Sequence, residues 1–547
     1  MDFVERAFNA IKNSKRNVLL KAPTGSGKTE VAIRVMRAFP GRIAYLSPLK
    51  ALSLQVYQRL KLKDSLYITG DEYLQPQPIR KRVVVTTYEK MDSLLRHDMI
   101  KDLSMVIIDE IHNVSTRPAI ENVVAYALMN NVRIIAMSAT IGGDLASWLD
   151  AELIEEKGER KVPLYKYVKY RDIVAGPMQF SKVVSEDPIR YAVENEKPVL
   201  IFVRSRWRAY EVQKQIPYDS VVFHGGLGSK ARATVLRQIL NKEKLVVVST
   251  TALGQGVNLP IWLVYFHDIE LPVIVKNKLV AWRWLTKNEF DQIAGRAGRP
   301  GFDTEGLVVV NSESNIDFER KIELVFSSPN EEVKGKANMY DFILFSLLFK
   351  PLDLDGIKAW LSKSFSLRDD PTEALEMLKG SSLITFDGKY SLTKLGKVLV
   401  QSYLDISSAV YYLPQLKNNA LTLIARSPQV VNASRGRDMY PLLKAWVSGE
   451  PVKTNANFTW HDFKQVLDIA NWQAYSLYKI CEVTNACDPV PVKKLYDELQ
   501  WGVPYSWIDL AKAKIPREKI VQLRKMGIQK DEVCEKAKDL VPEYCFF

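Results

Sequence analysis

Short apolar segments alternate with amphipathic helical segments over residues 1–310, and each apolar segment ends in a polar or Gly-containing loop. A parallel sheet needs this order, because each strand is followed by a crossover before the next strand can pair in the same direction. Two blocks can be separated, and the strands expected in them are 18–21, 43–47, 83–87, 106–109 and 134–138, then 199–203, 221–223, 245–250, 264–266 and 307–310. The pattern predicts two α/β lobes with parallel sheets.

After about residue 330 the strand pattern stops and helical periodicity takes over, with Trp and Tyr interleaved among Lys. A chain of 547 residues has room for about three to five domains. We therefore expect the two lobes to be followed by a mostly α-helical C-terminal region.

The segment Ala22–Thr29 follows the first strand and opens a helix, which is the context of a phosphate-binding loop. The glycines let backbone N–H groups approach the phosphates closely, Lys28 reaches the β- and γ-phosphates, and the Thr29 hydroxyl is placed to hold Mg²⁺. The residues expected to bind the nucleotide here are Pro23, Thr24, Gly25, Ser26, Gly27, Lys28 and Thr29. The cofactors predicted are ATP and Mg²⁺.

Adjacent carboxylates end the strand that contains Val106–Asp109. Asp109 is expected to coordinate Mg²⁺ and Glu110 to polarise the attacking water. His112 is interpreted as a polar link from these carboxylates to the neighbouring lobe, the alternative being a surface histidine.

A third group, Gln292 to Arg299, lies near the end of the second block and places Arg296 and Arg299 three residues apart. On a helix this spacing puts both side chains on one face, from which they could enter a phosphate site and stabilise transition-state charge. An arginine pair in isolation is more often a solvated face. Its position after a second α/β block favours the catalytic interpretation, together with Gln292.

The chain carries 76 Lys+Arg against 63 Asp+Glu, a formal charge of +13. This balance favours a polyanionic partner, the alternative being a solvated basic surface. The N-terminus lacks a signal-type apolar core and no run of eighteen apolar residues follows, so we expect a cytoplasmic protein that does not enter a membrane.

All four cysteines, Cys481, Cys487, Cys534 and Cys545, lie near the C-terminal end without a C-x-x-C pair. Neither a disulfide framework nor a zinc site is indicated, and an iron–sulfur cluster is disfavoured by their distribution. We expect reduced thiols.

Taken together, the motifs resemble superfamily 2 helicases of the Ski-like branch. Within it the chain resembles the archaeal Hjm-type DNA helicases, because Ser138–Gly142, Trp148–Leu153, Val162–Leu164 and Thr86–Arg96 follow that family's order. An adenine-reading Gln usually precedes the phosphate loop in the family, whereas no Gln occurs here before Gln55.

The resemblance implies roles for further residues. Together with His112, Ser138 and Thr140 would couple nucleotide hydrolysis to movement along the nucleic acid, and Gly256 would contact the nucleotide. Backbone contacts to a nucleic-acid strand, which hold it without reading its sequence, are implied for Pro48, Lys50, Thr69, Gly70, Thr87, Arg204, His224 and Thr250. A hairpin carrying Trp282 and Trp284 stands where the family splits the duplex; an ordinary packed hairpin is the alternative.

The resemblance also divides the chain into RecA-like domains over 1–170 and 171–330, a winged-helix domain over 331–405, a ratchet-like helical domain over 406–500 and a small helical domain over 501–547. In the ratchet-like domain Trp472 would stack on a base, whereas on periodicity alone a Trp in an amphipathic helix is more often a core residue. An Arg that the family has before this Trp is replaced by Lys464 and Gln465.

The function implied is an ATP-dependent DNA helicase that moves 3′ to 5′ on single-stranded DNA and unwinds forked or branched duplexes in replication-coupled repair or recombination, as a monomer. Two alternatives stay open: an RNA helicase of the same branch, and a nucleotide-gated clamp or remodeller of branched DNA that does not unwind.

Overall fold

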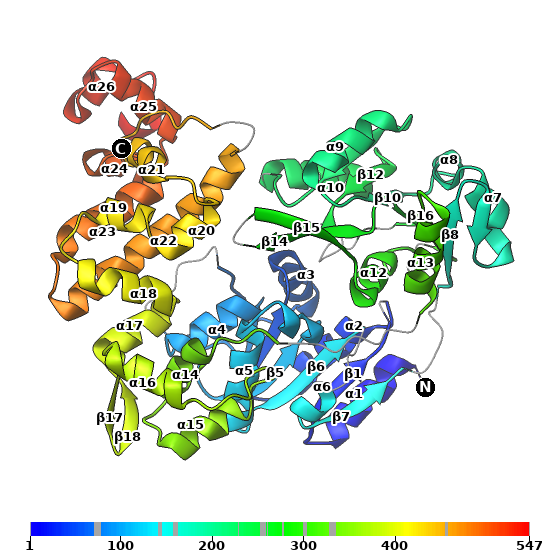
Figure 1. The fold of residues 1–547 in the computed structure, drawn as a ribbon, viewed down its shortest axis with the longest axis horizontal. Coiled ribbons are helices and arrows are strands. Elements are labelled where there is room, and N and C mark those ends of the chain that lie inside the picture. The colour runs from blue at the N-terminus through cyan, green and yellow to red at the C-terminus, as the bar shows by residue number, and fades with distance from the viewer. Residues whose placement is uncertain are drawn as a thin grey trace. The chain divides into compact units, whose positions relative to one another are not determined.

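The computed structural model describes residues 2–23, 25–70, 78–139, 145–156, 162–227, 229–251, 259, 261–275, 278–298, 303–327, 335–454 and 458–545 (Figure 1). The chain forms two compact units. One comprises Met1–Val273, Leu279–Ala337 and Trp360–Arg368, and the other comprises Ile274–Lys278, Asn338–Ala359 and Asp369–Phe547.

The first sheet has seven strands, all paired in parallel, in the order β3-β4-β2-β5-β6-β1-β7. Their bounds are β1 Asn17–Lys21, β2 Arg42–Ser47, β3 Ser65–Tyr67, β4 Val83–Thr87, β5 Leu103–Ile108, β6 Arg133–Ser138 and β7 Ala151–Glu155. All five strands expected from the sequence are confirmed. The two that were missed, β3 and β7, are the edge strands and lack an apolar run.

Helices surround this sheet: α1 Phe3–Asn13, α2 Lys28–Ala38, α3 Lys50–Leu60, α4 Tyr88–Arg96, α5 Ala119–Met129 and α6 Leu145–Trp148, with a 3-10 turn η1 at Ile111–Ser115. Apolar side chains of α1, α2 and α3 form one core with alternate residues of the strands, such as Val18, Ile43 and Val83. The helices on both faces bury the strands, as their continuous apolar runs predict.

The second sheet has the order β11-β12-β10-β13-β16-β8-β9, and only β8 with β9 is antiparallel. The bounds are β8 Leu164–Tyr170, β9 Ile173–Ala175, β10 Val199–Phe202, β11 Ser220–Phe223, β12 Val246–Ser249, β13 Leu263–Phe266 and β16 Gly306–Asn311. The five expected strands are again confirmed. β8 lies within residues that we expected in the first lobe, yet it pairs with β16 of the second sheet.

The helices of the second lobe are η2 Met178–Phe180, α7 Ser181–Ser185, α8 Pro188–Glu194, α9 Arg206–Gln215, α10 Ser229–Leu240, α12 Lys287–Ala294 and α13 Asn315–Phe326. Between β13 and α12, a separate two-stranded sheet is formed by β14 Glu270–Val275 and β15 Lys278–Trp284. Trp284 packs against the core of the second lobe, whereas Trp282 is 39% exposed.

The second unit is mostly helical. It begins with α14 Met339–Leu347, α15 Leu354–Leu361, whose last two residues belong to the first unit, and α16 Thr372–Gly380. The antiparallel hairpin of β17 Ile384–Asp387 and β18 Lys389–Leu392 and then α17 Lys394–Ser402 follow, and that these elements form a winged-helix domain stays a prediction. The remaining elements are α18 Ile406–Tyr412, η3 Leu413–Gln415, α19 Ala420–Ala425, α20 Pro428–Ala433, α21 Tyr440–Val447, α22 Trp460–Thr484, α23 Pro489–Trp501, η4 Tyr505–Trp507, α24 Ile508–Lys512, α25 Arg517–Lys525, η5 Lys530–Glu532, α26 Val533–Lys536 and α27 Pro542–Cys545.

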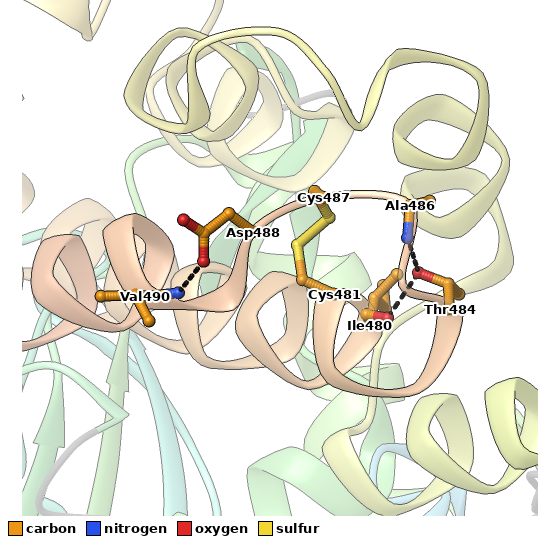
Figure 2. Close-up of a disulfide and its surroundings, with 7 residues drawn as sticks. All are labelled: Ile480, Cys481, Thr484, Ala486, Cys487, Asp488 and Val490. Atoms are coloured by element: carbon orange, nitrogen blue, oxygen red, sulfur yellow. Dashed lines mark hydrogen bonds between the residues drawn. A yellow bond between two sulfur atoms is a disulfide. The ribbon is translucent and has the colours of Figure 1, made fainter.

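The four cysteines form two disulfides, Cys481–Cys487 and Cys534–Cys545, so the expectation of reduced thiols is wrong. Figure 2 shows the first, which joins the last turn of α22 to the segment before α23. The chain reverses at Asn485, which ends α22 in the left-handed region with φ 52°, and this turn brings the Cα atoms of Cys481 and Cys487 to 5.0 Å. The distance suits a disulfide, although the spacing matches no familiar motif.

No helix among the described residues is long and apolar enough to cross a membrane. The same residues contain no group of three or more His, Cys, Asp or Glu side chains placed to hold a metal ion.

Candidate nucleotide and nucleic-acid site

The phosphate loop connects β1 to α2. Gly25 and Gly27 have φ of 83° and 100°, a region that favours glycine, and a Cβ on Gly27 would lie 2.5 Å from a methyl carbon of Val4. These two glycines let the loop turn so that Lys28 begins α2. Thr24 lies outside the described residues.

Lys28 is buried, and its ammonium group donates hydrogen bonds to the carbonyl oxygens of Ala22 and Pro23, the latter at 3.1 Å. Burial lowers the pKa of Lys28, while the charges of Glu110 and Asp109 raise it. The Ser26 hydroxyl is buried and makes no hydrogen bond within the described part of the chain. A buried cation and an unsatisfied hydroxyl at a helix N-terminus fit a nucleotide's phosphates. Pro23 and Thr29 flank them, and both are half-buried.

The two carboxylates follow β5. Asp109 accepts a hydrogen bond of 2.8 Å from the Tyr45 hydroxyl, and burial followed by the charge of Glu110 raises the pKa of Asp109. Glu110 stands in the left-handed region with φ 50°. Its Oε2 is buried and accepts no hydrogen bond from the described residues. Crowded carboxylates of this kind are stabilised by a cation, so Asp109 together with Thr29 fits a Mg²⁺ ion.

His112 joins these carboxylates to β6. Its Nδ1 lies 2.9 Å from the Ser138 hydroxyl and 3.4 Å from Oε2 of Glu110. Burial lowers the pKa of His112, so the imidazole is neutral at pH 7. The structure thus brings Glu110, His112 and Ser138 together within the first lobe, whereas the link from His112 to the neighbouring lobe stays a prediction. Thr140 lies outside the described residues.

The second lobe contributes Gln292, on α12, and Arg296. Burial lowers the pKa of Arg296, and the charge of Glu110 raises it, so this guanidinium lies within electrostatic reach of the first lobe's carboxylate. The expected helical arginine pair is wrong, because α12 ends at Ala294 with Gly295 as its cap and Arg296 follows in a turn. Arg299 and Gly256 lie outside the described residues.

The residues expected to contact the nucleic acid follow the carboxyl ends of neighbouring β-strands. In the first lobe Pro48 and Lys50 follow β2, Thr69 and Gly70 follow β3, and Thr87 ends β4. Because these strands run parallel, the residues lie at one edge of the sheet, which is also the edge of Ala22 and Asp109.

In the second lobe Arg204, His224 and Thr250 follow β10, β11 and β12, again at one edge. The Arg204 guanidinium donates to Glu270 at 3.2 Å and lies 4.7 Å from the ring centroid of Trp282. His224 accepts a hydrogen bond from the Gly226 N–H at 3.0 Å and pairs with the Tyr210 hydroxyl at 3.0 Å. These partners fix the directions of both side chains.

Comparison with known proteins agrees with this geometry. The model of the DEAD/DEAH box helicase family matches residues 3–147, and that of the helicase conserved C-terminal domain matches residues 183–301. A protein of the Sulfolobus islandicus filamentous virus named "Putative helicase 7" is 32% identical over 97% of this chain and 95% of its own length. The chain belongs to the superfamily 2 helicases.

Two further relatives are archaeal. The ATP-dependent DNA helicase Hel308 of Thermoplasma acidophilum is 31% identical over 72% of this chain and 66% of its own length. Hel308 of Pyrococcus horikoshii is 26% identical over 91% of this chain and 80% of its own length. The expected resemblance to Hjm-type, Ski-like helicases is confirmed, and the enzyme is an ATP-hydrolysing helicase.

In the second unit of the helicase, Trp472 lies on α22. It is half-buried, and its indole N–H donates to the Ser402 carbonyl of α17. Lys464 lies over the rings of Trp446 and Trp460, with its ammonium 4.3 and 5.4 Å from their centroids, whereas Gln465 is exposed. The lysine that replaces the family's arginine therefore packs within its own unit.

Two tyrosines of the helicase site escaped the sequence analysis. The buried Tyr45 holds the Asp109 carboxylate, and the Tyr88 hydroxyl donates to the Asp109 carbonyl. Tyr45 sits in an apolar strand where nothing marks it out. Tyr88 lies in the Thr86–Arg96 segment, whose resemblance implies contact with the nucleic acid and gives no sign of a role beside the carboxylates.

Proposed function

We propose that this helicase is an ATP-dependent DNA helicase that moves 3′ to 5′ along single-stranded DNA and unwinds forked or branched duplexes in replication-coupled repair or recombination. The observation that carries the proposal is the site where the buried Lys28 of the phosphate loop lies near Asp109 and Glu110, with the charge of Arg296 from the second lobe acting on Glu110. An arginine that reaches a hydrolytic site from a second lobe makes lobe closure depend on the γ-phosphate, and hydrolysis reverses the closure.

In the proposed mechanism Lys28 and the backbone N–H groups of Gly25 and Gly27 bind the phosphates. Glu110 accepts the proton of the attacking water, and Arg296, in the turn after α12, together with Gln292 of α12 stabilises the charge that develops on the transferred phosphate. Thr29 and Asp109 would hold Mg²⁺, which would neutralise charge at the phosphates. The unsatisfied Oε2 of Glu110 supports its role as the base.

We assign the coupling of hydrolysis to movement to His112 and Ser138. The neutral imidazole forms a hydrogen bond with the Ser138 hydroxyl at the end of β6, and the same nitrogen lies 3.4 Å from the Glu110 carboxylate. A change in the charge of the nucleotide beside Glu110 would alter this hydrogen bond. The strand itself would lie on the loops after β2, β3, β4, β10, β11 and β12, where polar side chains hold phosphates without reading bases.

DNA is proposed as the strand because the two Hel308 relatives are named as DNA helicases. The β14–β15 hairpin supports duplex splitting, because Trp284 anchors it on the lobe core while Trp282 stays partly exposed beside Arg204. We propose that it separates the strands.

The test is ATP hydrolysis with single-stranded DNA, with RNA and with neither, beside unwinding of duplexes that carry a 3′ or a 5′ tail. We expect stimulation by DNA and unwinding of the 3′-tailed duplex only. Lys28→Ala, which removes the phosphate-binding cation, is the inactive control. Stimulation by RNA alone would assign the chain to the RNA helicases, and stimulation by DNA without unwinding would make it a nucleotide-gated clamp.

A further inference from the structure

A cavity of 1310 Å³ opens in the first unit at the edge of the sheet opposite the phosphate loop. Its lining includes residues that precede β1, β6 and β7, among them Arg16, Val132 and Asp150, and residues of the segment 362–368. Because the strands are parallel, their amino ends lie a strand's length from the ends that carry Ala22 and Ser138. The cavity is therefore separate from the nucleotide site.

The charge of this cavity is strongly unbalanced. Its lining contains Lys15, Arg16, Arg133, Lys363 and Arg368 but only one carboxylate, Asp150. Within the described part of the chain, none of the five cations forms an ion pair with a carboxylate. Arg133 is fixed by hydrogen bonds of 2.9 Å to the carbonyl oxygens of Arg16 and Ile11. Five cations against one carboxylate in the lining favour an anionic occupant.

The wall formed by residues 362–368 is held firmly on the first lobe. The Glu121 carboxylate of α5 is fully buried and accepts hydrogen bonds from the backbone N–H groups of Phe365 and Ser366 at 2.8 and 3.0 Å. It also accepts hydrogen bonds from the hydroxyls of Ser364 and Ser366. A buried carboxylate needs several such donors, and here they all come from this segment and the neighbouring Ala337. The cavity is thus a built feature of the unit.

Two aromatic rings add an apolar component to the cavity. The indole N–H of Trp148 donates to the Lys363 carbonyl at 2.8 Å, and the ring centroids of Trp148 and Phe365 are 4.9 Å apart. Both residues line the cavity and are only half-buried. Cations beside partly exposed aromatic rings are the chemistry that binds single-stranded nucleic acids, through phosphates and stacked bases.

We propose that this cavity is a second binding site for single-stranded nucleic acid, apart from the strand path along the carboxyl edges of the two sheets. Its volume of 1310 Å³ exceeds the roughly 300–1,000 Å³ of small-molecule pockets and suits several nucleotides of a flexible strand. The choice of a nucleic acid over another polyanion rests on the proposed function. In this site the cations hold phosphates, and Trp148 and Phe365 contact bases.

The test counts binding sites. Wild-type protein is titrated with a fluorescent single-stranded DNA of about ten nucleotides, within the usual length for one such site, and anisotropy is measured over a range of salt concentrations. We expect two binding events per protein. In Lys15→Glu/Arg16→Glu the affinity of the weaker site should fall at least tenfold. The slope of the logarithm of that affinity against the logarithm of the salt concentration should become shallower by about 0.7 for each phosphate that the variant no longer holds.

The matched control is Lys61→Glu/Lys63→Glu, which makes the same charge change on exposed residues beside β3, at the far end of the same sheet. Two intact events in the cavity variant, or an equal loss in the control, would overturn the proposal. Inorganic tripolyphosphate is the competitor. If it displaces the labelled DNA from the weaker site at a lower concentration than unlabelled DNA does, the occupant is a free polyphosphate and the proposal also fails. DNA-stimulated hydrolysis, measured in parallel, tests the proposed function separately and is expected to persist in both variants.

Discussion

The nucleotide site of the first unit and helix α22 of the second unit differ in how their polar groups are satisfied. In the nucleotide site the Ser26 hydroxyl and Oε2 of Glu110 are buried without a hydrogen bond among the described residues. On α22 the indole N–H of Trp472 already has the Ser402 carbonyl as partner, and Lys464 lies over two Trp rings.

A buried unsatisfied group costs about 1–3 kcal/mol, so a fold retains one where a ligand will complete it. In the nucleotide site the unsatisfied atoms therefore belong to the groups expected to act on the ligand, whereas on α22 such an atom is Oδ1 of Asn471 and not the indole N–H of Trp472. Trp472 and Lys464 have packing partners within their own unit, and any role of theirs in binding a base must be added to that packing. The two regions should respond differently to substitution.

Glu110→Gln tests the nucleotide site with the largest expected effect. The amide cannot accept the proton of the attacking water, so the steady-state rate of ATP hydrolysis should fall by about 10³-fold or more while ATP binding persists. The control is Glu152→Gln, an exposed carboxylate of the same lobe. A normal hydrolysis rate in Glu110→Gln would remove the assignment of the base, and with it one half of the comparison.

Arg296→Ala tests whether the second lobe completes that site. If the Arg296 guanidinium stabilises transition-state charge as proposed, its loss should slow hydrolysis by about 10³-fold, with little change in the affinity for ATP. Arg320→Ala, at an exposed position on α13, is the matched control. Equal rates in the two variants would mean that the coupling between Arg296 and Glu110 has no catalytic consequence.

The same contrast explains what the sequence could predict. Lys28, Asp109, Glu110 and His112 follow apolar strands, and their chemistry restricts the residue types so strongly that position and role could both be inferred. Tyr45 could not be found, because its hydroxyl serves Asp109 from within an apolar strand. The prediction that Arg296 and Arg299 lie on a helix was wrong because the helical sequence pattern continues past Ala294, whereas the helix ends there.

Beyond the lobes the sequence was less informative. The two sheets and ten of their strands could be predicted because buried parallel strands are continuously apolar, whereas β3, β7, β8 and β9 at or near the sheet edges carry mixed patterns. The disulfides were missed since the pairing of Cys481 with Cys487 depends on the turn at Asn485, which no spacing rule describes.

Trp472→Ala tests α22 directly. If the exposed part of the indole stacks on a base, the free energy of single-strand binding should weaken by roughly 1–3 kcal/mol, measured by fluorescence anisotropy. Trp472→Phe keeps a ring but loses the hydrogen bond to Ser402, so it should retain most of the binding.

The control on the same helix is Trp460→Ala, whose ring packs against Trp446 and Phe463. If Trp472→Ala and Trp472→Phe lower the midpoint of thermal unfolding alike and leave strand binding unchanged, Trp472 is a packing residue and the contrast with the nucleotide site becomes sharper.

The Cys481–Cys487 disulfide gives the smallest expected effect. The covalent link closes a short loop of seven residues, Cys481 to Cys487, so its loss should reduce the free energy of unfolding by about 2 kcal/mol through the greater entropy of the unfolded chain. Cys487→Ser is the suitable change because Cys481 is 1% exposed and a hydroxyl there would be buried. The measurement is thermal unfolding in a Cys534→Ser/Cys545→Ser background, where dithiothreitol should reproduce the loss and add nothing to Cys487→Ser.

ATP hydrolysis without nucleic acid should stay unchanged, because the nucleotide site lies in the other unit. If the hydrolysis rate falls in Cys487→Ser, the end of α22 supports the nucleotide site, and the two regions can no longer be treated as independent.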